Sequence, residues 1–417
     1  MNRKIFPIKN DPACLLKWNH STVFLPKLTT ASCHRVTQHK FDLETFNFHN
    51  TPEKIKQREK MLAGEWPGEG CEHCKNVEDA GGTSDRIIHL DMPGFNPPKE
   101  LESNPTATTV TPKVLEIYFS NTCNLKCIYC GPHFSSQIQQ ENNKFGTFTK
   151  NNVILSKNYH LPEEFSSASD KMFEWLDAHV HELDKLMVLG GEPFIQKQTH
   201  RLLDFLSQRS LPNLDLVFFS NLTIEHEKFK NYMSTLNQLV KSENIGNINI
   251  IGSIDCWGAE AEYIRNGLNL ELFEKNFTYV LDNTNFILNI NSTLSPLSIK
   301  TLPELVEKIN TWSQKRMVYW SMMKTAGMRF MHPTIFGDKI LEHGFNQALD
   351  LYEDMGDPEK TSYKDYFVGI GKEIEQTPEN TKFQSELKTY LEELDRRRGT
   401  DYKNVFSYIH DMLEDNQ

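Results

Sequence analysis

The sequence predicts an α/β protein built on a parallel sheet. Short apolar runs rich in β-branched and aromatic residues alternate with helical patterns, and this alternation favours parallel strands joined by right-handed crossovers. Three closely spaced cysteines follow the first of these runs directly. The strands are expected at residues 114–119, 186–189, 214–219, 248–254, 286–290 and 317–320.

Helical patterns separate several of these strands and dominate the end of the chain. Near the N-terminus, Thr51 followed by a proline predicts the start of a helix that ends before Gly64. The last part of the chain is charged and helical, and it is expected to pack against the rest of the protein as a cover. Further helices are expected at residues 171–183, 200–208, 225–240, 338–352, 361–376 and 379–397.

Charge and hydropathy narrow the functional classes. The chain has 45 Lys and Arg against 56 Asp and Glu, a formal net charge of −11. This argues against a nucleic-acid partner, because binding phosphates requires clusters of Lys and Arg. No apolar run approaches the roughly 18–20 residues that span a bilayer, and the first residues lack the apolar core of a signal peptide. A cytoplasmic protein without membrane segments is therefore expected.

The cysteines fall into groups of four, three and one. In a reducing cytosol, closely spaced cysteines are more often metal ligands than disulfides. The groups are Cys14, Cys33, Cys71 and Cys74; then Cys123, Cys127 and Cys130; and finally Cys256.

The group of three has the spacing CxxxCxxC within residues 121–130. Three thiolates can each bind one iron of a cubane iron–sulfur cluster and leave the fourth iron without a protein ligand. Such an open iron can bind a substrate or cofactor, whereas a closed four-cysteine site can only transfer electrons or hold structure. The alternative is a zinc site, for which His133 is the nearest fourth ligand.

At these residues the chain resembles the radical S-adenosylmethionine (SAM) superfamily. In that family the open iron of a [4Fe-4S] cluster binds the amino and carboxylate groups of SAM. One electron then cleaves SAM to methionine and a 5′-deoxyadenosyl radical, which abstracts hydrogen from a substrate. The resemblance implies SAM and this cluster as cofactors and a flavodoxin- or ferredoxin-type electron donor. It also implies a partial (β/α)6 TIM-like barrel, in which chemistry collects at the C-terminal ends of the strands.

The N-terminal cysteines suggest a second metal site. Cys71 and Cys74 form a CxxC after a glycine-rich turn, and a predicted hairpin carries Cys14 and Cys33. This part resembles the twitch domain, a smaller relative of the SPASM domain, which implies one auxiliary [4Fe-4S] cluster on four cysteines. It departs from the usual pattern because the four cysteines precede the three-cysteine motif. A four-cysteine zinc site, a redox dithiol or a mixed site using His34 or His73 are the alternatives.

Polar residues after the predicted strands are candidate SAM contacts. Gly190, Gly191, Glu192 and Pro193 match the family's GGEP motif, whose backbone and acidic residue hold the SAM amino group. Alone the motif would be an ordinary strand-to-helix turn, but after the cysteine array it supports the resemblance. Alternation along the strand predicts that Ser253 and Asp255 point to one side. The resemblance implies contacts with SAM for Tyr129, Asn221, Ser253, Asp255, Arg265 and Asn291.

These assignments have plain alternatives. Helix capping accounts equally well for Asn221, core packing for Tyr129 and a surface salt bridge for Arg265. Cys256 lies outside both cysteine groups. It is a candidate catalytic residue, as a hydrogen-atom donor to a substrate radical, but a free cysteine more often fills space in a core.

The predicted organisation has three parts. They are a small twitch-like, cluster-binding N-terminal domain at 1–98, the partial barrel at 99–336 and a helical C-terminal tail at 337–417. The subgroup resemblance implies a ribosomally made peptide substrate that is crosslinked, epimerised or oxidised, together with a separate peptide-carrier protein. A small molecule or sugar is the enzymatic alternative. A structural zinc protein and an RNA-modifying radical SAM enzyme are the other classes considered.

Overall fold

The computed structural model describes residues 6–8, 11–68, 70–91, 95–156, 159–325, 327–352 and 361–414. These residues form an α/β fold with a large, mostly parallel sheet, as the alternation of strands and helices predicts. The chain divides into two compact units. Unit 1 consists of Met1–Asn121, His160–Phe218 and Thr235–Ile248, and unit 2 of Thr122–Tyr159, Phe219–Ser234 and Asn249–Gln417.

The strands of unit 1 lie in the order β9-β8-β4-β1-β2-β3. The pairs β1–β4, β4–β8 and β8–β9 are parallel, and β2 is antiparallel to both β1 and β3. The predicted N-terminal strand therefore pairs with the strand that precedes the three cysteines. The bounds are β1 (His20–Phe24), β2 (Thr29–Ala31), β3 (His39–Lys40), β4 (Val114–Tyr118), β8 (Lys185–Leu189) and β9 (Asp215–Ser220).

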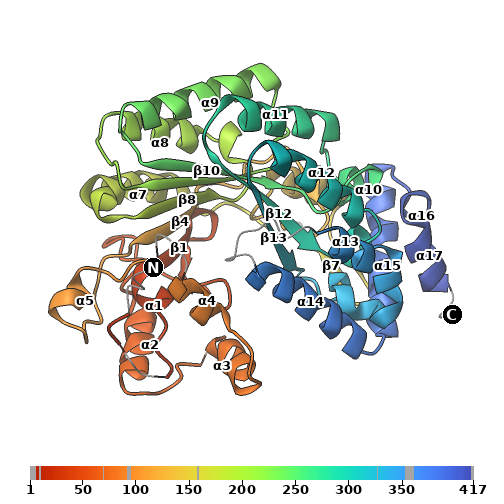
Figure 1. Ribbon diagram of the computed structural model, residues 1–417, viewed down its shortest axis with the longest axis horizontal. Helices are drawn as coiled ribbons and strands as arrows, with labels where there is room; N and C mark the ends of the chain where they lie inside the picture. The colour runs from red at the N-terminus through yellow and green to blue at the C-terminus, as the bar shows by residue number, and fades with distance from the viewer. Residues whose placement is uncertain are drawn as a thin grey trace. The chain divides into compact units, whose positions relative to one another are not determined.

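The helices of unit 1 lie on both sides of these strands (Figure 1). One of them begins as predicted, because the Thr51 hydroxyl accepts a hydrogen bond from the Lys54 amide and proline occupies the first turn. The α-helices are α1 (Leu16–Asn19), α2 (Pro52–Leu62), α3 (Cys71–Asp79), α4 (Asp85–Asp91), α5 (Glu100–Ser103), α7 (Phe165–His179), α8 (Lys197–Ser207) and α9 (His226–Lys241), which starts in unit 2. The 3-10 helices are η1 (Leu25–Lys27), η2 (Val180–Glu182) and η3 (Pro193–Ile195).

Unit 2 contains the parallel strands β10 (Asn247–Ser253), β12 (Ile287–Leu294) and β13 (Val318–Lys324) in that order. The first residues of β10 belong to unit 1. Two small antiparallel pairs complete the strands of this unit: β5 (Lys126–Cys127) with β11 (Arg265–Asn266), and β6 (Phe148–Lys150) with β7 (Val153–Leu155).

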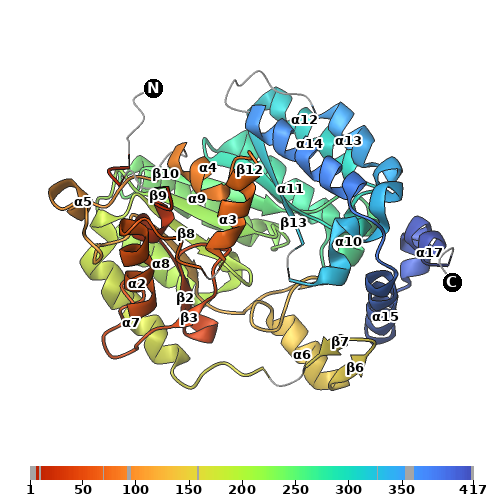
Figure 2. The same ribbon diagram turned by 90° about the horizontal axis from the view of Figure 1, so that it is seen from below.

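Helices of unit 2 pack in groups. Figure 2 shows α12, α13 and α14 lying side by side and α15 beside the β6–β7 hairpin. The α-helices are α6 (Ser136–Phe145), α10 (Ala259–Ile264), α11 (Leu270–Asn283), α12 (Leu302–Lys315), α13 (Phe345–Leu351), α14 (Thr361–Gln376), α15 (Thr381–Arg398), α16 (Tyr402–Val405) and α17 (Ser407–Glu414). The 3-10 helices are η4 (Pro296–Ser298), η5 (Arg329–Met331) and η6 (Pro333–His343).

The structure corrects one predicted helix. Residues 338–352 do not form a continuous α-helix, because η6 ends at His343 and α13 starts after Gly344. Gly344 has φ +156°, and a β-carbon there would overlap the Ile299 carbonyl, so only glycine fits this break.

The unit boundaries also differ from the expected divisions at residues 98 and 336, because β1 pairs with β4. The three-part organisation stays a prediction. Within the described part of the chain, no helix is both long and apolar enough to cross a bilayer.

Candidate functional site

The cysteines of the CxxxCxxC array lie on one loop at the start of unit 2. Cys127 ends β5, and Cys123 and Cys130 flank that strand. All three are partly exposed. Hydrogen bonds from the next helix hold this cysteine loop: the Cys123 amide donates to Ser136 Oγ at 3.2 Å, and Ser135 Oγ donates to the Leu125 carbonyl at 2.6 Å. The serine side chains at the start of α6 therefore hold the loop through its backbone, at Cys123 and at Leu125.

A second segment pairs with the cysteine loop. Arg265 lies opposite Cys127 in the β5–β11 pair, and the Ile128 amide donates to the Ile264 carbonyl at 2.8 Å. This pairing places Arg265, a predicted site residue, directly beside the cluster-type cysteines. A main-chain ladder of this kind fixes the register of the two segments.

Asp255 joins both segments. Its carboxylate accepts two bonds from the Arg265 guanidinium, at 3.0 Å from Nε and 2.8 Å from Nη2, and one at 2.7 Å from the Tyr129 hydroxyl. The Thr293 amide donates a fourth at 2.8 Å. Both charged side chains are buried, with 0% of Asp255 and 7% of Arg265 exposed. Burial by itself lowers the pKa of Arg265, but the carboxylate of Asp255 beside it raises it above its usual value.

The predicted pairing of Ser253 with Asp255 on one side of a strand is wrong. β10 ends at Ser253, and regular alternation ends with it. Ser253 is partly exposed and stands opposite Asn291 in the β10–β12 register, whereas Asp255 is fully buried against Arg265. The structure thus brings Asp255, Arg265 and Tyr129 together in a buried group. Their contacts with SAM stay predictions.

The two predicted asparagines lie at the ends of strands. Asn221 follows β9 and donates at 2.8 Å to Asn124 Oδ1 in the cysteine loop, while its own Oδ1 accepts from the Thr223 amide at 2.8 Å. Asn291 accepts from Ser321 Oγ at 2.9 Å across the β12–β13 pair. Asn221 therefore both caps its own turn and links that turn to the cysteine loop.

The C-terminal helix α15 also contacts the cysteine loop, which sequence reasoning missed. The hydroxyl of Tyr390 donates to the carbonyl of Ile128, which lies between Cys127 and Cys130. The sequence predicted that this helix packs against the rest of the protein but carried no signal for its partner. A contact between residues so distant in the chain depends on the tertiary fold.

A buried ionic network supports this contact. Glu141 on α6 accepts from Lys126 at 2.8 Å and from Arg398 at 3.0 Å. The side chains of Glu141 and Arg398 are only 5% and 4% exposed. Arg398 and Lys126 lower the pKa of Glu141, against the effect of burial, which raises it. Lys126 belongs to the cysteine loop, so the network joins the loop to α6 and α15.

The GGEP residues follow β8 in unit 1. Gly190 has φ +75° and Gly191 φ +56°, and a β-carbon on Gly190 would overlap the Tyr118 ring. Glu192 is fully buried, and its carboxylate accepts from the Phe194 amide at 3.2 Å as Pro193 begins η3. The turn therefore requires glycine and caps a 3-10 helix, as expected of an ordinary strand-to-helix turn.

Cys256 is completely buried next to Asp255. Burial raises the pKa of its thiol well above the usual value. A substrate atom has no access to this thiol in the described conformation. The geometry favours packing, and the hydrogen-donor role stays a prediction.

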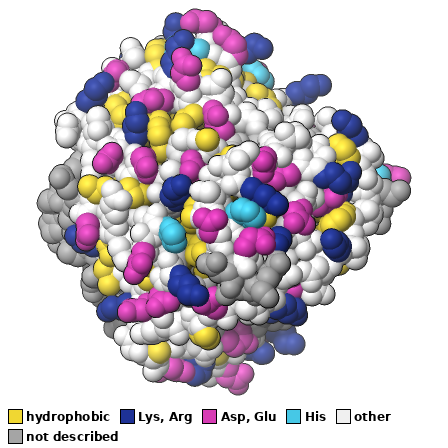
Figure 3. Space-filling model, turned by 90° about the vertical axis from the view of Figure 1, so that its right-hand side faces the viewer, with side chains coloured by type: hydrophobic (Ala, Val, Ile, Leu, Met, Phe, Trp, Pro, Cys, Tyr) yellow, Lys and Arg dark blue, Asp and Glu magenta, His cyan; other side chains and the backbone are white. Residues whose placement is uncertain are grey.

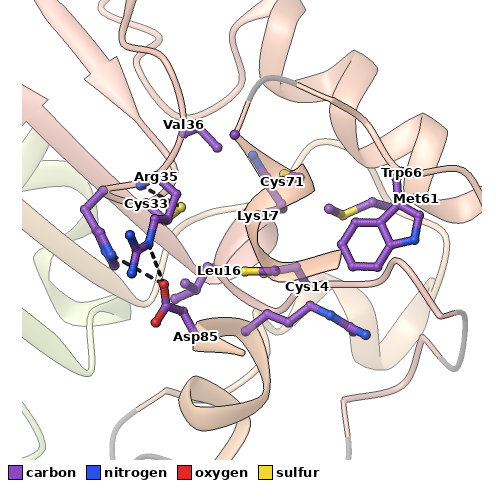
Figure 4. Close-up of a pocket in the computed structure, with 14 residues that line it drawn as sticks. Cys14, Leu16, Lys17, Cys33, Arg35, Val36, Met61, Trp66, Cys71 and Asp85 are labelled. Atoms are coloured by element: carbon purple, nitrogen blue, oxygen red, sulfur yellow. Dashed lines mark hydrogen bonds and ion pairs between the residues drawn. The ribbon is translucent and has the colours of Figure 1, made fainter. Parts of the chain in front are cut away.

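The four N-terminal cysteines line one pocket in unit 1, which we call the four-cysteine pocket. Figure 4 shows the sulfur atoms of Cys14, Cys33 and Cys71 around the same space. The fourth cysteine, Cys74, lies one turn after Cys71 on α3. Strand β1 follows Cys14, and strand β2 ends shortly before Cys33. Because the two strands pair, they help bring these distant cysteines together.

Burial favours the neutral form of three thiols of the pocket, Cys14, Cys71 and Cys74. Burial raises the pKa of Cys14 to about 12 and also raises the pKa of Cys71 and Cys74. Burial likewise raises the pKa of Cys127 and Cys130 in the cysteine loop. Metal binding must therefore displace protons at both places.

Both groups offer thiols, the donor chemistry of iron–sulfur clusters. His34 and Asp85, which lie 3.5 Å apart, also line the four-cysteine pocket. Among the described residues, no three His, Cys, Asp or Glu side chains are gathered as ligands of one metal ion. A cubane places each cysteine on a different iron, so its thiolates stand farther apart than the ligands of a single ion. His133 packs over Gly131 and against Phe134, with ring centroids 4.3 Å apart.

No protein-family model matches the chain. Over 245 residues it is 22% identical to the radical SAM cyclopropyl synthase TigE of Paramaledivibacter caminithermalis, a match that covers 58% of this chain and 46% of TigE. The chain thus matches a little under half the length of this curated relative.

Two solved structures also resemble the chain. Streptococcus suis SuiB bound to S-adenosylmethionine aligns with TM-score 0.39 and 13% identity over 82% of this chain and 66% of SuiB. SuiB bound to its precursor peptide SuiA aligns with TM-score 0.37 and 12% identity over 85% and 70% of the respective chains. These structural likenesses are too weak to bear on function. In sequence, the chain is similar to a radical SAM enzyme.

Proposed function

We propose that this protein is a radical SAM enzyme, which reductively cleaves SAM to a 5′-deoxyadenosyl radical and abstracts hydrogen from a substrate. The observation that carries the proposal is the cysteine loop, which presents Cys123, Cys127 and Cys130 together at the start of unit 2. The sequence similarity to TigE, named a radical SAM cyclopropyl synthase, supports it.

In this proposal the three cysteines hold a [4Fe-4S] cluster with one iron left for SAM. When bound, the cluster supplies the electron that cleaves SAM. The residues of the chain hold the loop in place. Asp255 binds Arg265, which pairs with the loop as part of β11. The Tyr390 hydroxyl binds the Ile128 carbonyl within the loop. Such support keeps the reacting groups in a fixed geometry.

The four-cysteine pocket is proposed to hold an auxiliary [4Fe-4S] cluster. Its support is the convergence of Cys14, Cys33, Cys71 and Cys74 on one pocket, the last two from α3 and the others from two different segments. A twitch-like function for this part of the chain rests on the same residues. Four thiolates would close the cluster, so its role would be to carry electrons or to hold structure.

A ribosomally made peptide is the proposed substrate class, with a flavodoxin- or ferredoxin-type electron donor and a separate carrier protein as partners. The class follows from the auxiliary-cluster subgroup that the sequence resembles. A basic nucleic-acid surface receives no support from Figure 3. On the face shown there, Lys and Arg are interspersed with Asp and Glu among the described side chains.

The test is metal analysis after anaerobic reconstitution. Iron and sulfide content and EPR spectra are measured for the native chain and for the variant with Cys14, Cys33, Cys71 and Cys74 replaced by Ala. We expect two clusters in the native chain and one in the variant, with the retained signal responding to SAM and yielding 5′-deoxyadenosine. Zinc at the N-terminal cysteines would remove only the auxiliary-cluster assignment. Absence of any SAM-responsive cluster would refute the enzyme proposal.

A further inference from the structure

Lys17 is a buried cation at the wall of the four-cysteine pocket. Only 2% of the residue is exposed. It lies between Cys14 and β1 in the chain and lines the pocket together with Cys71. Burial raises the pKa of the Cys71 thiol, and the positive charge of Lys17 opposes that rise. Figure 4 shows the Lys17 side chain extending to Cys71. Its ammonium group also donates to Gln57 Oε1 at 2.6 Å, which is a neutral acceptor.

The other cations of the pocket have acidic partners. Arg35 pairs with Asp85 at 2.7 Å, and Arg86 pairs with Glu78. Within the described ranges, no carboxylate is recorded against Lys17. A buried charge without a counter-ion is costly, so the position of this ammonium calls for a negative group nearby.

Helix α2 carries two further buried basic side chains. Arg58 is fully buried and donates to the Lys17 carbonyl at 2.6 Å. Lys54 is 1% exposed and donates to four neutral oxygens, two of hydroxyl groups and two of carbonyls. Burial lowers the pKa of both side chains, that of Lys54 well below its usual value. Of these three basic side chains, Lys17 is the one that lines the four-cysteine pocket.

Neutral thiols do not compensate this charge, but thiolates bound to a metal centre do. The negative charge of four thiolates exceeds the positive charge of a zinc ion or of an oxidised [4Fe-4S] core, so the complete centre is an anion. We infer that Lys17 is the counter-ion of an anionic four-thiolate centre, raises its reduction potential and couples the stability of unit 1 to its occupancy. This inference rests on the proposed auxiliary site.

The first test measures the reduction potential. Lys17→Met removes the buried charge, Lys17→Arg keeps it, and Lys56→Met removes one charge from an exposed position of α2 as a matched control. EPR redox titration of the full reconstituted chain follows the cluster signal that does not respond to SAM. We expect Lys17→Met to shift its reduction equilibrium at least tenfold toward the oxidised form, about 59 mV for one electron. Lys17→Arg and Lys56→Met should stay within threefold of the native chain.

The second test separates a counter-ion from a merely structural side chain. Chemical denaturation of the metal-loaded and metal-free full chain is compared for the same variants. As a counter-ion, Lys17 stabilises only the loaded form, so Lys17→Met should lower the midpoint of the loaded protein and raise that of the metal-free protein. Loss of ordinary packing or of the Gln57 hydrogen bond would lower both midpoints.

The outcomes distinguish this inference from the proposed function. If the native chain binds metal through these cysteines but Lys17→Met behaves like Lys56→Met in both tests, the counter-ion role is wrong and the auxiliary site stands. If replacement of Cys14, Cys33, Cys71 and Cys74 by Ala changes no metal content, the auxiliary site and the counter-ion role fall together.

Discussion

Replacing Asp255 by Asn should destabilise unit 2 and loosen the cysteine loop. The carboxylate is fully buried and binds Arg265 at two points, together with the Tyr129 hydroxyl and the Thr293 amide. The amide of Asn keeps the size of the side chain but removes its charge. Arg265 would then be a buried cation with no carboxylate among its recorded partners.

The expected magnitude follows from this geometry. Removing one partner of a buried ion pair costs about 3–5 kcal/mol, because the other charge stays buried without compensation. For a domain of roughly 150–250 residues, each kcal/mol lowers the melting temperature by about 2–4 °C, so a decrease of about 10 °C is expected. The matched control is Asp282→Asn, which breaks an exposed pair with Lys315. Exposed pairs contribute at most about 1 kcal/mol.

The assay is thermal and chemical denaturation of the full chain, combined with the rate of iron release from the reconstituted protein. We expect Asp255→Asn to lower stability and speed iron release, and Asp282→Asn to change neither. If Asp255→Asn unfolds like the native chain while its affinity for SAM falls, Asp255 binds the ligand and does not hold the loop. That result would refute the structural reasoning and favour the contact with SAM that the sequence resemblance implies for Asp255.

Two further substitutions test other parts of the structure. Glu141→Gln should lower the free energy of unfolding by about 3 kcal/mol at neutral pH, because Arg398 stays buried without its partner. The folded-state pKa of Glu141 is lowered, so its contribution is present above the ordinary value of about 4.3 and is lost as pH falls through the folded value. The stability difference between Glu141→Gln and the native chain should therefore shrink on acidification; a constant difference would contradict this. In urea denaturation, Gly190→Ala should lower the free energy of unfolding by about 1–3 kcal/mol more than Gly64→Ala does. Both glycines have positive φ, but of the two only Gly190 faces a ring, that of Tyr118. Equal losses of stability in the two variants would show that the contact with Tyr118 does not destabilise Gly190→Ala.

Local patterns in the sequence were enough to locate the main elements. Six strands of the large sheet were expected close to where they occur, because apolar runs and their β-branched content depend on neighbouring residues alone. Thr51 capped α2 as predicted, since a cap bonds an amide three residues away. The cysteine groups could be defined by spacing, because iron–sulfur and zinc sites constrain the separation of their ligands.

The partners of the site residues were decided by the tertiary structure. Alternation predicted that Asp255 would share a face with Ser253, but the strand ends there and Asp255 turns inward to Arg265. The break at Gly344 was missed because it depends on the approach of the Ile299 carbonyl.

The contacts that support the two cysteine groups were also beyond the sequence. Tyr390 reaches Ile128 across 262 positions of the chain, and Arg398 reaches Glu141 across 257. Nothing in the sequence around Lys17 shows that its ammonium is buried beside Cys71. By itself, the sequence determined which residues can carry the chemistry and which elements they follow. Only the tertiary structure decided which charges are buried together, because such pairs depend on how distant segments pack and not on local periodicity.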